Sequence, residues 1–248
     1  MPREFEIHRV AELDTTPEQV WEAIATGPGI DSWFVGRSHV EPAEGGAVRT
    51  DMGNGHVQES IVTAWNPLKQ FAYRSAGENG RFVAFDYLIE GRGGGSTVLR
   101  TVASGFLPGD DWEAEYDAMT KGGEMYFRTL VERLTHFPGR AASSFTVFGP
   151  PVAGWERTRA VLVGALGLSD PVTEGDRVRF TPDGLPPVEG VVYAVNPDTL
   201  GVRTGDAMYR FLRAFQGGLM IGHHVFSDGT DLAETERAWR AWLTRLPV

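Results

Sequence analysis

The side chains in the first half of the chain that could bind or transform a small molecule are mostly aromatic. Sites for small molecules are predominantly apolar and carry a few polar groups that fix the orientation of the ligand. As a set, the large rings therefore predict an apolar ligand site, although simple core packing is the competing interpretation for each ring taken alone. The candidates are Trp33, Phe34, Trp65, Tyr73, Phe85, Tyr87, Phe106, Trp112 and Tyr126.

Ionisable side chains accompany these rings on or beside predicted strands, namely His56, Arg74, Asp86 and Arg100. Alternate residues of a strand point to opposite faces of the sheet, so about half of such charges face solvent. A charge that points inward needs a partner or a polar ligand, because an unpaired buried charge is costly. An inward arginine could hold a carboxylate or enolate oxygen with its planar fork of donors. Arg100 is therefore included among the candidate ligand-binding residues, and no residue is assigned a catalytic role.

Other motifs exclude several kinds of site. The adjacent residues His223 and His224 would point to opposite faces of a strand and could not share one metal ion. The chain has no cysteine, and no other metal-ligand spacing is present, so neither a metal nor a cofactor is predicted. The glycine-rich segment 91–96 leads into a strand rather than a helix, which favours a hairpin turn over a phosphate-binding loop.

The acidic residues Asp110, Asp111, Glu113, Glu115 and Asp117 allow two interpretations. They could form a paired-carboxylate site, or they could be the solvated first turns of a helix, where negative charge complements the helix dipole. The second interpretation is preferred.

The elements that must position these residues occur twice. Glu59–Pro67 returns as Glu189–Pro197 with five of nine positions identical, at an offset of 130 residues. A second similarity, between 127–134 and 239–246, has an offset of 112, so the second copy is shorter. Two copies at so long a period indicate two domains of one type. We predict a domain at 1–137, a linker at 138–144 and a diverged domain at 145–248.

Each copy is predicted to contain a strand, a helix, a run of antiparallel strands and a long final helix, which is an α+β architecture. A single helix against a curved sheet leaves one sheet face to bury and a space between the two. In the first copy the predicted strands are 5–13, 57–64, 71–75, 82–90 and 97–106, followed by a helix that ends near 135. In the second copy they are 145–148, 177–180, 188–195, 200–203, 208–215 and 219–226, with helices at 155–166 and around 239–246.

Composition limits the partners. The net charge of −10 argues against nucleic acid, which attracts basic surfaces. No run of about 18 apolar residues predicts a membrane span, and the N-terminus does not resemble a signal peptide. These features predict a cytoplasmic protein.

A set of short motifs gives the first copy a resemblance to a known family. In order they are Val20-Trp21, Asp31-Ser32-Trp33-Phe34, Gly45-Gly46, Asn66-Pro67, 96–99 and Gly122-Gly123. Residues 3–137 resemble the bacterial proteins similar to the activator of the heat-shock-protein-90 ATPase. That family belongs to the SRPBCC superfamily, which has the helix-grip fold of START domains and the birch-pollen allergen. Many relatives have Gly-Trp at the start of the last helix, whereas this chain has Gly123-Glu124.

The resemblance implies two helix-grip domains and an apolar cavity between the sheet and the last helix. It implies a small hydrophobic ligand, bound without catalysis, and the alternative is an aromatase/cyclase-like enzyme that acts on a polyketide in the same cavity. A chaperone partner is not expected, because the eukaryotic activators carry a further N-terminal domain for which no room exists before Phe5. We expect the first domain to hold the ligand, with Trp33 and Phe34 near the entrance and Tyr87 and Phe106 deeper. The shorter second domain is expected to have a filled core, as a structural or partner-binding module would.

Overall fold

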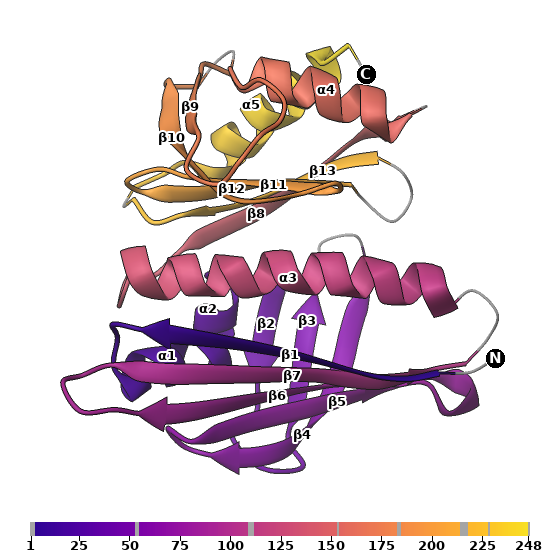
Figure 1. Ribbon diagram of the computed structural model, residues 1–248, viewed down its shortest axis with the longest axis vertical. Coiled ribbons are helices and arrows are strands. Elements are labelled where there is room, and N and C mark those ends of the chain that lie inside the picture. Colours follow the sequence, from indigo (N-terminus) through magenta and orange to yellow (C-terminus); the bar gives the residue numbers. More distant parts are fainter. Residues whose placement is uncertain are drawn as a thin grey trace. The chain divides into compact units, whose positions relative to one another are not determined.

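In the computed structural model the described residues are 3–52, 55–108, 112–152, 154–182, 185–213, 218–227 and 229–247. The chain divides into two compact units, Met1–Ala141 and Ala142–Val248, here called the N-terminal and the C-terminal unit. Each unit has an antiparallel sheet with helices, so the predicted α+β architecture of two similar domains is confirmed (Figure 1).

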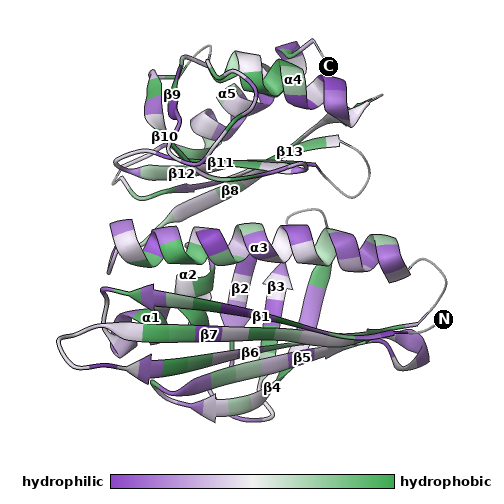
Figure 2. Cartoon of the chain, in the orientation of Figure 1, coloured by the Kyte–Doolittle hydropathy of each residue, from purple (hydrophilic) through white to green (hydrophobic). Residues whose placement is uncertain are grey.

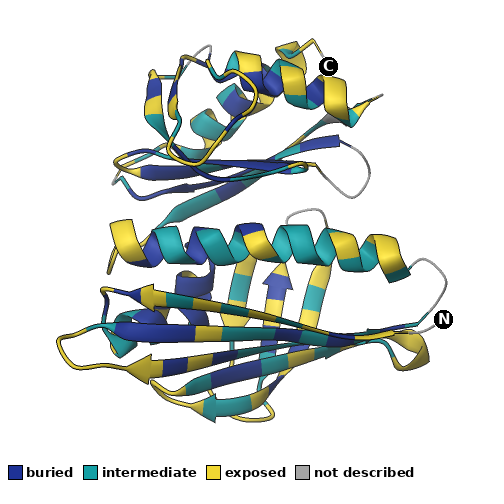
Figure 3. Cartoon of the chain, in the orientation of Figure 1, coloured by how far each residue is buried: buried dark blue, intermediate teal, exposed yellow. Residues whose placement is uncertain are grey.

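The N-terminal unit is built around a seven-stranded sheet with the strand order β1-β7-β6-β5-β4-β3-β2. The face of this sheet that packs against α1 and α3 is called the inner face. Hydrophobic and hydrophilic residues alternate along the strands, as do buried and exposed ones (Figures 2 and 3). The elements are β1 (Arg3–Leu13), α1 (Pro17–Ala25), α2 (Gly27–Ile30), β2 (Arg37–Val40), β3 (Ala47–Asp51), β4 (Val57–Asn66), β5 (Gln70–Ala76), a 3₁₀ turn (Glu78–Gly80), β6 (Phe82–Gly91), β7 (Thr97–Leu107) and α3 (Trp112–His136).

The long helix α3 covers the inner face through an apolar stripe. Leu130 and Leu134 are each 1% exposed and join a core with Val20 and Ile24 of α1 and Leu99 of β7. The burial of these side chains is the main force that holds helix and sheet together.

The first helix, α1, begins after an N-cap at Thr16. The Thr16 hydroxyl accepts a hydrogen bond from the Gln19 backbone N–H, and the Gln19 side chain accepts one from the Thr16 N–H at 3.2 Å. This reciprocal pair satisfies two backbone donors that a helix start leaves unpaired.

We expect Thr16→Ala to weaken α1 by about 0.5–2 kcal/mol, because the cap acceptor is lost. Hydrogen-exchange mass spectrometry of the full chain should show faster exchange over 17–25. Thr16→Ser keeps the acceptor and is the matched control. Equal exchange in the alanine and serine variants would contradict the cap assignment.

The C-terminal unit repeats this topology with one strand fewer. Its six strands lie in the order β8-β13-β12-β11-β10-β9, which matches the first sheet when the edge strand β2 is left out. The elements are β8 (Ser143–Pro151), α4 (Trp155–Ala165), β9 (Arg177–Phe180), β10 (Val188–Asn196), β11 (Thr199–Arg203), β12 (Ala207–Arg213), β13 (Gly218–Val225) and α5 (Leu232–Arg245).

The repeat extends to a backbone irregularity. The pairing of β4 with β5 shifts register between Val62 and Ala64, and the pairing of β10 with β11 shifts between Val192 and Ala194. These positions are 130 residues apart, the offset of the sequence repeat. The strands β4 and β10, which end just before Pro67 and Pro197, therefore hold equivalent places, and the bulge is part of what the repeated sequence specifies.

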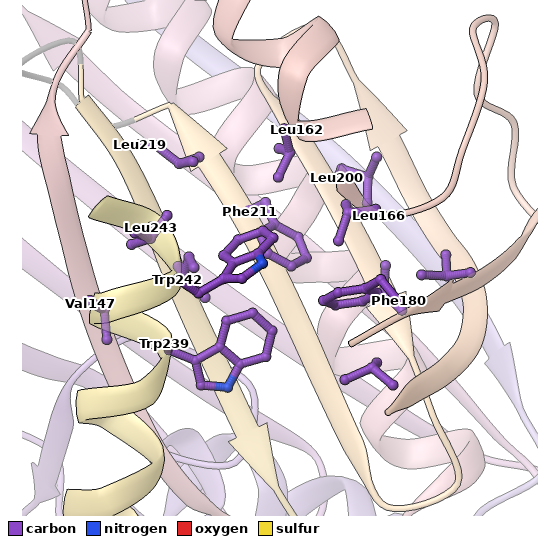
Figure 4. Packing of buried hydrophobic residues seen from close by; sticks show 14 of the residues in the cluster. Val147, Leu162, Leu166, Phe180, Leu200, Phe211, Leu219, Trp239, Trp242 and Leu243 are labelled. Carbon is purple, nitrogen blue, oxygen red and sulfur yellow. The ribbon is translucent and has the colours of Figure 1, made fainter. Parts of the chain in front are cut away.

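The core of the C-terminal unit lies between α4, α5 and one face of the sheet. Trp239 and Trp242 of α5 have ring centroids 5.4 Å apart, and Trp242 lies 6.0 Å from Phe211 and 5.9 Å from Phe180 (Figure 4). Aromatic pairs at such distances contribute beyond their buried area.

Candidate functional site

Two rows of side chains cross the inner face of the N-terminal sheet. The strand register places Thr101 of β7 between Arg9 of β1 and Tyr87 of β6, and Phe71 and Trp65 continue the row on β5 and β4. Because residues opposite one another in a sheet share a face, these side chains all point to the inner face. In the neighbouring row, Tyr73 of β5 lies opposite Phe85 of β6.

The rings of these rows form a continuous aromatic wall. Phe71 is at its centre, with ring centroids 5.5 Å from Trp65, 5.4 Å from Tyr73 and 6.3 Å from Tyr87. Trp21 of α1 extends the wall, 5.0 Å from Trp65. Phe71 is fully buried, whereas Trp65 and Tyr73 keep part of their surface accessible.

The two tyrosine hydroxyls lie in a poorly hydrated environment. Burial raises the pKa of Tyr73 to about 12, although a hydrogen bond from Tyr87 acts in the opposite direction. Burial, with the nearby Tyr73 and the hydrogen bond to it, raises the pKa of Tyr87 well above its ordinary value, and the positive charge of Arg9 opposes this shift. Both hydroxyls therefore stay protonated at neutral pH and can act as hydrogen-bond donors.

Arg9 supplies a positive charge on the inner face. Its side chain is 10% exposed, and its Nε donates to Glu124 Oε2 at 3.0 Å. Its Nη2 donates to the Thr120 carbonyl of α3 at 3.1 Å. No hydrogen bond joins Nη1 to another described residue, so part of the fork of donors is available.

One glycine of the pair Gly122-Gly123, Gly123, makes room for this arginine. The two glycines lie in the middle of α3, not at its start as the sequence resemblance suggested. A Cβ at Gly123 would lie 3.1 Å from Arg9 Nη2, whereas a Cβ at Gly122 would meet nothing within 4 Å. Glu124, which stands where many relatives have tryptophan, is the carboxylate that binds Arg9.

These neighbours give a matched pair of substitutions. Each glycine-to-alanine change should stabilise the helix by up to about 1 kcal/mol, because alanine is the better helix former. Only Gly123→Ala should displace the Arg9 guanidinium and weaken binding of an anionic aromatic probe several-fold. Probe titrations of Gly122→Ala and Gly123→Ala check this, and equal affinities would show that Gly123 does not control Arg9.

Trp33 and its neighbours do not all lie where the sequence predicted. Trp33 is 4% exposed and its indole Nε1 donates to the Ala23 carbonyl at 2.8 Å, so it anchors the core rather than an entrance. Phe34 is half-buried and packs against Tyr126 of α3, with ring centroids 4.4 Å apart. Trp112 belongs to another cluster, with Phe5, Val83 and Leu107 as its buried members.

Two candidates lie on the outer face of the sheet, which corrects their prediction as cavity residues. Arg100 is exposed and lies 3.9 Å from Glu90. Phe106 lies opposite Phe82, whose ring stacks under Arg74 with a distance of 3.9 Å from the guanidinium carbon to the ring centroid. Side chains alternate between the two faces along β7, so Thr101 points to the inner face, whereas Arg100 and Phe106 point to the outer face.

Comparisons with known proteins identify the N-terminal unit. Residues 14–135 match the family model described as "Activator of Hsp90 ATPase homolog 1-like protein". The N-terminal unit belongs to this family. The C-terminal unit lies outside the match and is a second, shorter copy of the helix-grip fold. No curated protein sequence is significantly similar to the chain.

Several solved structures are similar to the chain at low sequence identity. BexL, a di-domain ARO/CYC from the BE-7585A biosynthetic pathway, is 14% identical, with 96% of this chain and 93% of BexL covered and a TM-score of 0.46. DynU16, from the dynemicin biosynthetic locus, is 20% identical, with 96% and 94% covered and a TM-score of 0.43. The Aha1 dimer from Colwellia psychrerythraea is 20% identical, with 52% and 96% covered and a TM-score of 0.41.

Arg9, the arginine on the inner face of the N-terminal sheet, was not among the candidate site residues predicted from the sequence. A signal for it exists, because Arg9 shares the strand phase of Phe5 and Ile7, and both of these contact the core. A charge on an apolar phase is the pattern that marks an inward-facing ionisable group.

The remaining motifs match their structural interpretations where the structure describes them. His223 and His224 pair with Phe145 and Ser144 on β8 at successive positions, so they point to opposite faces. Within the described part of the chain, no group of three His, Asp or Glu could hold a metal ion. Segment 91–96 is a hairpin turn closed by a hydrogen bond from the Arg92 N–H to the Ser96 carbonyl at 2.8 Å.

Of the acidic run, Asp110 and Asp111 lie outside the described residues. Glu113 and Glu115 are in the first turn of α3, Glu115 forms an ion pair with Arg81, and Asp117 is paired with Lys121 at 2.6 Å. No helix among the described residues is both long and apolar enough to cross a membrane.

Proposed function

We propose that the N-terminal unit binds a small hydrophobic molecule that carries an anionic or strongly polar oxygen, and that it does so without transforming this ligand. The ligand lies between the aromatic wall and α3, with its oxygen at Arg9. The observation that carries the proposal is the position of Arg9, an inward-facing arginine with free donors beside the hydroxyls of Tyr73 and Tyr87.

The burial pattern of the rings supports a space beside this arginine. Trp65, Tyr73 and Phe85 point to the inner face yet remain only half-buried, and Phe34 and Tyr126 are half-buried on the opposite side. A well-packed core leaves no such surface on inward rings. An apolar surface with a few convergent polar groups is typical of small-molecule sites.

The electrostatics favour binding over proton transfer. The tyrosine hydroxyls have raised pKa values and donate hydrogen bonds at neutral pH, so they can hold an oxygen but are poor bases. Glu124, the carboxylate nearest to Arg9 in the network, is 52% exposed and already accepts from the guanidinium. The donors complement a carboxylate, sulfonate or enolate.

We expect 8-anilinonaphthalene-1-sulfonate to bind the full chain and Arg9→Met to weaken this binding by about tenfold or more, the value of a hydrogen bond to a charged group. Arg100→Met is the matched control, because it removes the same charge from the outer face of the same sheet. Fluorescence titration gives the dissociation constants, and circular dichroism verifies that both variants fold. Equal affinity of the two variants would refute a site at Arg9.

A polyketide aromatase/cyclase-like activity in the same space is the second candidate. It is favoured by the donors of Arg9 and of Tyr73, whose hydroxyl accepts from Tyr87. These donors could stabilise an enolate during ring closure of a poly-β-ketone. Incubation of the full chain with a poly-β-keto thioester, followed by mass spectrometry for loss of water, tests it. Turnover that depends on Arg9 and not on Arg100 would replace the binding proposal with the enzymatic one.

A further inference from the structure

The C-terminal unit has a pocket of its own at one end of its sheet, with a volume of about 470 Å³. The pocket lies where β10 begins, where β11 turns into β12 and where the chain passes from β13 to α5. Its volume is within the range of small-molecule sites, about 300–1,000 Å³. The shorter copy therefore has a packed core and also an open pocket, which differs from the expectation of a core filled throughout. The apolar part of the wall consists of Leu185, Pro186, Val188, Tyr209, Val225 and Trp239.

The charged side chains of this wall are both acidic. Glu189 is paired with Arg179 at 3.1 Å, and both are exposed. Asp206 accepts a hydrogen bond from the Thr204 hydroxyl at 2.9 Å and has no basic partner among the described residues. Burial and the charge of Asp206 together raise the pKa of Tyr209 to about 12, so the carboxylate acts electrostatically on the pocket.

Two aromatic rings stand beside this carboxylate. The centroids of Tyr209 and Trp239 are 5.4 Å apart, at an interplanar angle of 41°. Both rings are held from behind by His223, with centroids 4.5 Å and 4.4 Å away, so their positions are fixed before a ligand arrives. Trp239 is 2% exposed, whereas Tyr209 is half-buried and keeps part of its surface accessible. The face of an aromatic ring attracts a cation.

We propose that this pocket binds a small organic cation with an apolar body, its ammonium group at Asp206 and its body against Tyr209, Pro186 and Pro187. The site is separate from the one at Arg9, which favours the opposite charge. A competing influence is present at the start of α5, where Thr230 and Thr235 line the pocket and the helix dipole favours an anion. Asp231 occupies the N-cap and accepts from the Glu234 N–H at 2.9 Å, and its carboxylate offsets that dipole.

Three compounds of nearly equal shape test the proposal on the full chain: 2-naphthylmethylamine, 2-naphthylmethanol and 2-naphthoate. Dissociation constants come from the shift of the Trp239 indole resonance in nuclear magnetic resonance titrations. We expect the amine to bind about tenfold more tightly than the alcohol, since a hydrogen bond between two charged groups is stronger than one between neutral groups, and the carboxylate to bind most weakly. Equal binding of amine and alcohol, or preference for the carboxylate, would overturn the proposal.

Substitutions then locate the charge. Asp206→Asn should weaken binding of the amine at least fivefold, because the negative charge is lost. Binding of the alcohol should not change, because asparagine keeps the acceptor for the Thr204 hydroxyl. Glu236→Gln removes a carboxylate on α5 that is paired with Arg240 and lies outside the pocket wall. This substitution should leave the affinities for the amine and for the alcohol unchanged. Arg9→Met should also leave amine binding intact, which separates this site from that of the N-terminal unit. Loss of amine affinity with rising salt provides the same test without a substitution.

Discussion

Replacing Arg133 by alanine is expected to lower the free energy of unfolding of the N-terminal unit by about 3–5 kcal/mol. Arg133 is 2% exposed, near the end of α3. Its guanidinium donates to the Ser32 hydroxyl at 3.0 Å, to the Arg140 carbonyl at 2.7 Å and to the Phe137 carbonyl. Removal of the guanidinium takes one donor from each of these acceptors, although the Phe137 carbonyl keeps the Arg140 N–H at 3.2 Å. A buried polar group that loses its partner costs about 1–3 kcal/mol.

The same contacts explain why the effect should spread beyond the helix. Ser32 follows α2 and donates in turn to the Gly29 carbonyl at 2.6 Å, so Arg133 joins the end of α3 to α2. Burial lowers the pKa of Arg133, and the charge of Glu22, 3.6 Å away, opposes this shift. The arginine is thus a charged group stabilised in the interior by directed hydrogen bonds.

Chemical denaturation of the full chain, read by hydrogen exchange in each unit, measures the loss. Arg128→Ala is the matched control, because the side chain of Arg128 on the same helix is 43% exposed and lies 3.7 Å from Glu124. A surface pair of this kind contributes about 0–1 kcal/mol. Arg133→Lys should recover part of the stability, since lysine keeps the charge but not the fork of donors. A loss below about 1 kcal/mol for Arg133→Ala would mean that water replaces the guanidinium.

Arg133 also shows where prediction from sequence reaches its limit. Composition alone makes 138–144 a linker, because the segment has small residues and breakers. The structure ties Arg140 to α3 through Arg133 and ends the N-terminal unit at Ala141. Arginine is usually exposed, and an ion and hydrogen-bond network between distant residues leaves no periodic pattern in the sequence.

The fold was more accessible than the site, because strand alternation and repeats are local signals. The predicted strand 177–180 is β9, and the helix predicted to end near 135 is α3, which ends at His136. The short strands β2 and β3 were not separately predicted, since four or five residues at a sheet edge carry little periodicity. Residue type was enough to predict the aromatic residues of the wall, which include Trp65, Tyr73, Phe85 and Tyr87. The arginine that faces them depends on strand phase. The prediction named Arg100, whereas the arginine on the inner face is Arg9.

His223 should make the stability of the C-terminal unit sensitive to acid. The residue is fully buried among Phe145, Tyr209, Phe211 and Trp239, and neither ring nitrogen has a hydrogen-bond partner of normal geometry in the described part of the chain. Burial lowers its pKa well below the ordinary value of 6.5, the Gly222 backbone opposes the shift, and the charge of Arg210 reinforces it. The folded unit therefore holds this histidine neutral, whereas the unfolded chain takes up a proton near pH 6.5.

The sign of the effect follows from this difference in proton binding. Below about pH 6.5 the unfolded state binds the additional proton, so stability falls as the pH falls, by up to about 1.4 kcal/mol per pH unit until the folded-state pKa is reached. Above pH 6.5 both states are neutral at this residue, and it adds no pH dependence.

His223→Phe isolates this contribution, because phenylalanine keeps an aromatic ring among its neighbours but does not titrate. Denaturant unfolding of the full chain at a series of pH values, read by hydrogen exchange over β12, β13 and α5, should give a shallower acid slope in the variant than in the parent protein. The carboxylates of the unit contribute equally to the acid slopes of the parent protein and the variant, so their contribution cancels when the two slopes are subtracted. The N-terminal unit provides an internal control, since its slope should not change. Parallel slopes in parent and variant would mean that the histidine finds water or a partner when protonated, and that this buried ring does not limit the stability of the C-terminal unit in acid.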